Sequence, residues 1–214
     1  MSRSPIETGA GEADASPFQA LVFDLGGVLV AHDNALLYQR LASRCAGACS
    51  PETVVGLMRK TDWSSGAAVS TLHDQLRDEL GYGVGWDDFV ADWCCHFAVD
   101  DSMLAFVERL ARRNRVMLFS NTNKEHWDFL VGATNGRLGR FEAYLSHEIG
   151  ATKPSLRSFQ VVAEKAGIDP GRSIFFDDLI DNVEGARRAG FQAELFESEA
   201  GLAAFLKGRG VRLD

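Results

Sequence analysis

Two short apolar runs in this chain end in aspartate, and they constrain the fold more than any other feature. Ala20-Leu-Val-Phe precedes Asp24, and Ser173-Ile-Phe-Phe precedes Asp177 and Asp178. Runs that are apolar throughout and contain β-branched or aromatic residues are typical of strands covered on both faces. We therefore expect both runs to be central strands of a parallel sheet.

Strands and helices alternate along the second half of the chain. Further strands are predicted at 115–120, 143–146 and 192–196, and helices at 103–113, 124–131, 155–166, 182–189 and 200–207. Strands that alternate with helices of about ten residues form βαβ units. The chain is therefore predicted to be an α/β protein with a doubly wound, Rossmann-like parallel sheet, whose core comprises residues 18–32 and 100–214.

Residues 33–99 have a different character. Four helical patterns occupy this stretch, with no convincing strand, and Val28–Val30 are expected as a short hairpin arm. An insertion of this kind can cover a crevice, so we expect a small four-helix cap at 33–99. Residues 1–17 are rich in Gly, Ala, Ser, Glu and Pro and are expected to be a disordered tail.

Composition limits the classes of partner. A formal charge of −8 and a pI near 5.1 argue against nucleic acid or an anionic membrane as the main partner. The chain has no apolar stretch of about 18 residues and no apolar leader, so we expect a cytoplasmic protein, as a monomer or homodimer. The four cysteines lie in helical patterns and are expected to be small hydrophobes rather than zinc ligands.

Polar residues follow four of the predicted strands or the loops after them. They are Asp24, Ser120-Asn121-Thr122, Lys153 before Pro154, and Asp177-Asp178 with Asp181. Each alone could be a helix cap or a surface charge. Together they would meet in the crevice beyond the carboxyl ends of the strands. Crowded carboxylates there favour a hard divalent cation such as Mg²⁺, and the set suits phosphoryl transfer to or from a small phosphorylated metabolite.

These motifs resemble those of a known family. Phe23-Asp24-Leu-Gly-Gly-Val-Leu29, Ser120-Asn-Thr-Asn123, Lys153-Pro154 and Phe176-Asp-Asp-Leu-Ile-Asp-Asn182 are similar, in order and spacing, to the four motifs of the haloacid dehalogenase-like (HAD) hydrolases. The resemblance covers about residues 18 to 210. Within the superfamily, the chain looks most like the helical-cap branch that contains α-D-glucose-1-phosphate phosphatase.

The resemblance implies a role for each site residue. Asp24 would be the nucleophile that forms an aspartyl-phosphate, Ser120 would hold a phosphate oxygen with the N–H of Asn121, and Lys153 would neutralise charge and orient Asp24. The implied Mg²⁺ ligands and supporting residues are Asp24, the carbonyl of Gly26, Asp177, Asp178 and Asp181. The substrate-binding residues that we expect are Gly26, Gly27, Asn121 and Thr122 and, in the cap, Trp63, which lies beside Gly66 at the end of a helical pattern.

One position departs from the family pattern. Most family phosphatases carry an aspartate, which serves as general acid, two residues after the nucleophile, and this chain has Gly26 there. We hypothesise either a substrate whose leaving group departs easily, such as an anomeric or acyl phosphate, or a proton supplied by His32 or Asp33. Aromatic and histidine residues of the cap that could face the substrate are Trp63, His73, Trp86, Trp93 and His96.

Three functions remain open on the sequence. The leading prediction is a Mg²⁺-dependent phosphatase that acts on a sugar phosphate-like metabolite. A 2-haloacid dehalogenase would form its ester without metal, and the Asp177-Asp178 pair argues against it. A catalytically weak binding or regulatory module that keeps the fold is the third.

Overall fold

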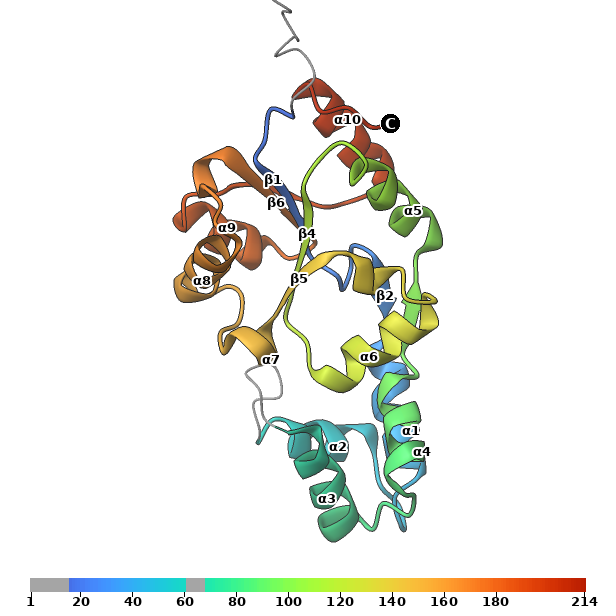
Figure 1. Ribbon diagram of the computed structural model, residues 1–214. Coiled ribbons are helices and arrows are strands. Elements are labelled where there is room, and N and C mark those ends of the chain that lie inside the picture. Colours follow the sequence, from blue (N-terminus) through green and yellow to red (C-terminus); the bar gives the residue numbers. More distant parts are fainter. Residues whose placement is uncertain (1–15, 61–67) are drawn as a thin grey trace, which may run out of the picture.

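A five-stranded parallel sheet forms the centre of the computed structural model, which describes residues 16–60 and 68–214 (Figure 1). The strands are β1 (Ala20–Phe23), β4 (Val116–Ser120), β5 (Glu142–Leu145), β6 (Ser173–Asp177) and β7 (Gln192–Leu195). Their order is β5-β4-β1-β6-β7, and every pairing is parallel. The chain thus adds strands on one side of β1 and then on the other. This reversal opens a crevice at the carboxyl ends of β4, β1 and β6.

Helices cover both faces of the sheet (Figure 1). The first face packs on α5 (Asp101–Leu110), α6 (Lys124–Ala133) and α10 (Glu199–Gly208), and the second on α8 (Leu156–Ala166) and α9 (Ile180–Arg188). Alternate strand residues point to opposite faces, so Leu21 and Phe23 belong to one core cluster and Ala20 and Val22 to the other. The predicted α/β fold with a doubly wound parallel sheet is confirmed.

Between β1 and α5, the described residues form four helices, which lie away from the sheet (Figure 1). They are α1 (Asn34–Ser43), α2 (Pro51–Met58), α3 (Val69–Leu80) and α4 (Trp86–Cys94). Local signals set their ends. The Asp33 and Ser50 side chains accept hydrogen bonds from the first turns of α1 and α2, and Gly81 ends α3 with a φ of 64°.

The four helices have an apolar cluster of their own, to which Leu41, Leu72, Leu76 and Phe89 contribute. Asp92 is buried on α4 and accepts a hydrogen bond of 2.8 Å from the Tyr82 hydroxyl. All four cysteines are free thiols, and Cys94 is buried in this cluster. Residues 1–15 of the predicted tail lie outside the described residues.

A two-stranded ribbon connects these helices to the sheet region. β2 (Val30–His32) pairs antiparallel with β3 (Phe97–Val99), with Val30 opposite Val99. The expectation of no strand in 33–99 was therefore wrong. The hairpin arm expected at Val28–Val30 overlaps β2 only at Val30, and β2 pairs with a segment on the far side of the four helices. Among the described residues, no helix has the length and apolarity needed to cross a membrane.

Candidate active site

Three carboxylates meet where β1 and β6 end. Asp24 directly follows β1, Asp177 is the last residue of β6, and Asp178 follows it. Parallel pairing of Phe23 with Phe176 brings these strand ends level. One carboxylate oxygen from each of the three lies within 4.8 Å of the others, and Asp24 and Asp177 are buried. The fold thus brings together acidic residues that follow two strands lying far apart in the sequence.

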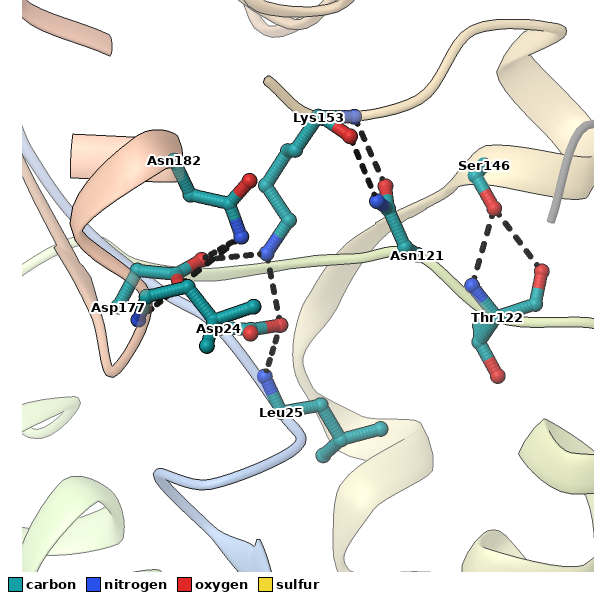
Figure 2. A network of polar contacts seen from close by, with 9 residues as sticks. Asp24, Leu25, Asn121, Thr122, Ser146, Lys153, Asp177 and Asn182 are labelled. Carbon is teal, nitrogen blue, oxygen red and sulfur yellow. Dashed lines mark hydrogen bonds and ion pairs between the residues drawn. The ribbon is translucent and has the colours of Figure 1, made fainter. Parts of the chain in front are cut away.

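Lys153 bridges two of these carboxylates (Figure 2). Its Nζ lies 2.8 Å from Oδ1 of Asp24 and 2.7 Å from Oδ2 of Asp177. The side chain is 1% exposed, and the ammonium lies 5.2 Å from the ring centroids of both Phe119 and Phe175. A buried ammonium of this kind is stable only with such partners, so Lys153 is part of the acidic site and not a surface charge.

The hydrogen bonds of Asp24 leave one of its oxygens available. Oδ1 accepts a hydrogen bond of 2.6 Å from the N–H of Leu25 as well as the ion pair with Lys153. Within the described residues, no hydrogen bond reaches Oδ2. Asp177 is more fully engaged, because its oxygens accept bonds from Lys153, from Asn182 Nδ2 at 3.0 Å and from the N–H of Leu179 at 2.9 Å. Of these two buried carboxylates, Asp24 is therefore the one that keeps an oxygen free for chemistry.

The acidic group carries more negative charge than Lys153 neutralises. Burial raises the pKa of Asp24 to about 7 against the opposing effect of Lys153, and the charge of Asp177 adds to the rise. Burial, and then Asp177, also raise the pKa of Asp178. A divalent cation would relieve both effects, and Mg²⁺ prefers carboxylate and carbonyl oxygens. The donor set therefore fits the magnesium ion that the sequence predicted, with Asp24, Asp177 and Asp178 as its candidate ligands.

The turn after β1 fits closely against Asp178. Gly27 has a φ of 73°, and a Cβ at this position would overlap the Asp178 carboxylate, so only glycine suits both the conformation and the space. Gly26 lines the cleft beside His32: a Cβ at residue 26 would stand 3.6 Å from His32 Nδ1. The imidazole thus lies beside the position where most family phosphatases carry their acid.

The end of β4 supplies the other wall of the site. Ser120 and Thr122 are buried, and with Asn121 they line the cleft. The Thr122 N–H donates to Ser146 Oγ at 2.9 Å, and that hydroxyl donates back to the Thr122 carbonyl at 3.0 Å. This exchange fixes the loop, so the Thr122 N–H is already used. The Asn121 side chain instead pairs with the main chain of Lys153 (Figure 2).

The cleft itself has a volume of about 310 Å³ and lies between the strand ends and the ribbon. Beyond the acidic group its walls include Asn34, His96, Phe97 and His126. Burial lowers the pKa of His96 to about 4, and burial, with His96 close by, lowers that of His126 to about 3. Both imidazoles are therefore neutral near pH 7, so this wall offers polar but uncharged groups.

Some predicted residues lie elsewhere. Asp181 is exposed in the first turn of α9 and is not in the acidic group. His73 and Trp93 belong to the interior of the four-helix cluster, and Trp63 lies outside the described residues. Sequence reasoning missed the roles of Asn182 and Ser146. Asn182 had a signal, since it follows Asp177 by five residues in the next helix, whereas nothing local marks Ser146 as the partner of Thr122.

The comparisons with known proteins agree with this arrangement. The model of the haloacid dehalogenase-like hydrolase family matches residues 18–190. The chain therefore belongs to the haloacid dehalogenase-like hydrolase family, as its four motifs predicted. The finer resemblance to the branch of α-D-glucose-1-phosphate phosphatase stays a prediction.

Two relatives are phosphatases by name. A phosphatase of Mycobacterium tuberculosis is 41% identical over 73 residues, which are 32% of this chain and 34% of that protein. The matched region thus spans about a third of that relative. D-ribitol-5-phosphate phosphatase of Bacteroides thetaiotaomicron is 25% identical over 193 residues, covering 85% of this chain and 92% of the relative.

Solved structures share the fold. A HAD family enzyme of Bacteroides thetaiotaomicron, crystallised with magnesium and inorganic phosphate, has a TM-score of 0.75 at 24% identity and covers 86% of this chain and 98% of that one. A predicted HAD-like hydrolase of Porphyromonas gingivalis has a TM-score of 0.76 at 21% identity, with coverages of 90% and 99%.

Proposed function

We propose that this chain is a Mg²⁺-dependent phosphatase that hydrolyses a small phosphorylated metabolite through an aspartyl-phosphate on Asp24. The observation that carries the proposal is the bonding of Asp24. Its Oδ1 is held by Lys153 and the Leu25 N–H, while Oδ2 accepts no hydrogen bond from the described residues and lies at the cleft. A carboxylate oriented through one oxygen presents the other as a nucleophile.

The reaction takes place in two steps. Asp24 Oδ2 attacks phosphorus, and the bond from phosphorus to the oxygen of the leaving group breaks. Water then attacks phosphorus, the bond from phosphorus to Asp24 Oδ2 breaks, and inorganic phosphate leaves as the Asp24 carboxylate is restored. The proton that the water loses returns to the group that protonated the leaving oxygen in the first step. Lys153 and the hydroxyl of Ser120 stabilise the phosphoryl oxygens, which carry most of the charge in such transfers. Bound Mg²⁺ would supply further neutralisation of this charge through Asp24, Asp177 and Asp178.

His32 is the proton donor that we propose for the leaving group. Its imidazole is exposed at the cleft beside Gly26, and histidine is the side chain that most often serves as a general acid. Asp33, the other candidate, is committed to α1, because its Oδ1 accepts hydrogen bonds of 2.9 and 3.2 Å from the N–H groups of Ala35 and Leu36. The structural contrast between these two neighbours favours His32.

The substrate is proposed to be a phosphate ester of a small hydroxylated molecule, such as a sugar or polyol. Among the described residues that line the cleft, Lys153 is the one lysine or arginine, and it is already paired with Asp24 and Asp177. A second phosphate on the substrate would find no cation there, whereas Asn34 and His96 can pair with hydroxyl groups. The named activity of the Bacteroides relative, on D-ribitol 5-phosphate, is of this class. We further propose that α1–α4 act as the cap over this cleft.

The two alternative functions, a dehalogenase and a binding module, differ from the phosphatase in whether a metal ion is needed and in whether a substrate is turned over. A dehalogenase needs no cation, so the buried carboxylates Asp177 and Asp178 would be an uncompensated cost in its site. One neighbour of this fold is described as a dehalogenase, with a TM-score of 0.58 at 19% identity, which bears on the fold alone. A binding module would bind phosphate without hydrolysis.

The test is a substrate panel with purified protein. Sugar and polyol monophosphates, a sugar bisphosphate, acetyl phosphate and a 2-haloacid are assayed with Mg²⁺ or with EDTA. Asp24→Asn should abolish turnover, whereas Asp88→Asn, an exposed carboxylate on α4, should leave it unchanged. Release of phosphate that needs both Mg²⁺ and Asp24 supports the phosphatase. Halide release without Mg²⁺ identifies the dehalogenase, and no turnover of any compound by a folded protein indicates the binding module.

A further inference from the structure

Lys153 is held at its main chain as well as at its ammonium. The Asn121 side chain donates from Nδ2 to the Lys153 carbonyl at 2.9 Å and accepts at Oδ1 from the Lys153 N–H, also at 2.9 Å (Figure 2). Both polar atoms of one amide therefore bind the main chain of one residue. This is the geometry of a strand pairing, supplied by a side chain. It connects the end of β4 to the loop before α8.

A second contact, from α9, holds the next residue, Pro154. Gly185 of α9 lies against Pro154, so that a Cβ at residue 185 would stand 2.6 Å from the Pro154 carbonyl oxygen and 3.1 Å from its Cβ. Real Cβ atoms do not approach backbone atoms this closely. The absence of a side chain at 185 thus allows α9 to approach the Lys153-Pro154 segment. Phe159 of α8 lies at 3.0 Å from the same point.

The position of the ammonium depends on both contacts. Nζ must lie within hydrogen-bond distance of Asp24 and Asp177 at once, at 2.8 and 2.7 Å, and the side chain is 1% exposed, with Nζ 5.2 Å from the ring centroids of both Phe119 and Phe175. A side chain buried to this extent has little freedom to adjust, so a shift of its main chain is transmitted to its tip. A displacement of about 1 Å is enough to break such a pair of bonds and to lower a rate by about 100-fold.

We propose that Asn121 and Gly185 are positioning residues, which set the place of the Lys153 ammonium by fixing the main chain of Lys153 and Pro154 through two separate contacts. Neither residue needs to touch substrate through its side chain for this role. The consequence for turnover rests on the proposed function, whereas the consequence for Lys153 itself does not.

The first experiment measures the accessibility of Lys153 and needs no turnover. Native protein is treated with acetic anhydride, and the labelling rate of each lysine is read by mass spectrometry, with exposed Lys165 as the internal reference. Lys153 should react slowly in the wild type. In Asn121→Ala its rate relative to Lys165 should rise by about tenfold, as expected for the loss of two hydrogen bonds. Gly185→Ala should have the same effect without removing any polar group.

The matched control is Gly132→Ala. Gly132 is also a helical glycine, on α6, and a Cβ there meets nothing within 4 Å. Gly132→Ala should therefore leave Lys153 as protected from acetylation as it is in the wild type. An unchanged Lys153 rate in folded Asn121→Ala and Gly185→Ala overturns the proposal. Exposure of all lysines together in both variants would show general unfolding and also count against a local role.

The second experiment asks whether Asn121 acts through Lys153. In the wild-type background, Asn121→Ala should lower kcat by about tenfold or more and change KM much less. In a Lys153→Met background the same substitution should cause no further loss, because the group that it positions has gone. Equal losses in both backgrounds would reveal a role independent of Lys153. If the wild type has no phosphatase activity but the labelling result holds, the proposed function fails and the positioning role stands.

Discussion

Adjacent residues in this site perform different tasks, as His32 and Asp33 illustrate. Asp33 accepts two hydrogen bonds from the first turn of α1, while His32 stands at the cleft beside Gly26. Their separation results from the end of β2, where the side chains of successive residues point in opposite directions. Sequence reasoning found both residues but could not choose between them. The choice depends on the turn that folds β2 back against Gly26.

Replacement of His32 should affect substrates according to their leaving groups. His32→Ala should lower kcat for an alkyl phosphate by about 10²–10⁴-fold, since the leaving oxygen then lacks a proton donor. Acetyl phosphate, whose leaving group departs as a carboxylate, should be hydrolysed nearly as fast as by the wild type. Steady-state kinetics on the two compounds give the comparison. Asp33→Ala should lower both rates little and instead reduce the free energy of unfolding by about 1 kcal/mol through loss of the cap. If His32→Ala lowers the rates on the alkyl phosphate and on acetyl phosphate by the same factor, His32 is not the proton donor for the leaving group.

Gly27 gives a second prediction at the scale of one residue. Gly27→Ala should weaken Mg²⁺ binding, because the methyl group would displace the Asp178 carboxylate and the positive φ disfavours alanine. Gly136→Ala is the matched control, since its φ is 79° but a Cβ there meets nothing within 4 Å. Both variants should lose about 1 kcal/mol of stability, and only Gly27→Ala should need more Mg²⁺ for half-maximal activity. The same Mg²⁺ requirement in both variants would refute the contact with Asp178.

At the scale of elements, the contact between α4 and α6 anchors the four-helix insertion to the core. The His126 ring of α6 stacks on Trp93 of α4 with centroids 4.8 Å apart, and its Nε2 lies 3.3 Å from the Trp93 carbonyl oxygen. Asn123 is the N-cap of α6. Its Oδ1 accepts a hydrogen bond from the main-chain N–H of His126, and its Nδ2 lies 3.2 Å from Nδ1 of the His126 ring. A neutral imidazole satisfies all of these partners.

This contact should weaken in acid. Burial lowers the pKa of His126 to about 3, so the folded protein keeps the ring neutral while the unfolded chain takes up a proton below about 6.5. The unfolded state then binds more protons, and stability is lost as the pH falls from about 6.5. His96, with a pKa of about 4, acts in the same direction. Burial raises the pKa of Asp24, which therefore titrates in the opposite sense, so the wild type and His126→Gln are compared by urea denaturation at pH 7.5 and 5.0. On acidification the wild type should lose more stability than His126→Gln, by at most about 1.4 kcal/mol per pH unit below about pH 6.5. The same pH dependence in both proteins would contradict this.

The sequence predicted regular elements better than contacts between them. The strands β1, β4 and β6 and the helices after them follow from apolar runs, caps and glycines, all of which are local signals. The β2–β3 ribbon was missed because its two strands have three residues each and are far apart in the chain. The pairing of Asn121 with Lys153 was missed for a similar reason. Side chains that bind distant main-chain atoms leave no periodic pattern in sequence.

For the whole molecule, the acidic site is a source of instability that a cation removes. Burial raises the pKa of Asp24 to about 7, so without metal the folded protein binds a proton that the unfolded chain has released above about pH 4. Stability should therefore fall as the pH rises from about 4 to about 7. Mg²⁺ binds the ionised carboxylates and opposes this loss.

The stabilisation by Mg²⁺ should consequently depend on pH. The increase in Tm caused by Mg²⁺, measured against EDTA, should be larger at pH 8 than at pH 6, because a cation competes with the proton at the lower pH. Asp24→Asn removes the titrating group and should make the increase smaller and nearly independent of pH. Differential scanning fluorimetry of both proteins provides the measurement. Identical increases at the two pH values in the wild type would rule out a site made by Asp24.

The β2–β3 ribbon has a consequence for how such proteins diversify. The chain leaves the core through β2 and returns through β3, so both connections of the four-helix insertion lie side by side. Insertions with adjacent ends can be replaced, lengthened or removed without moving the strands that hold the carboxylates. The ribbon is thus a natural junction for recombination. Under the cap role that we propose for α1–α4, chimeras that exchange the segment between Asp33 and His96 should keep the acidic site and change the range of substrates.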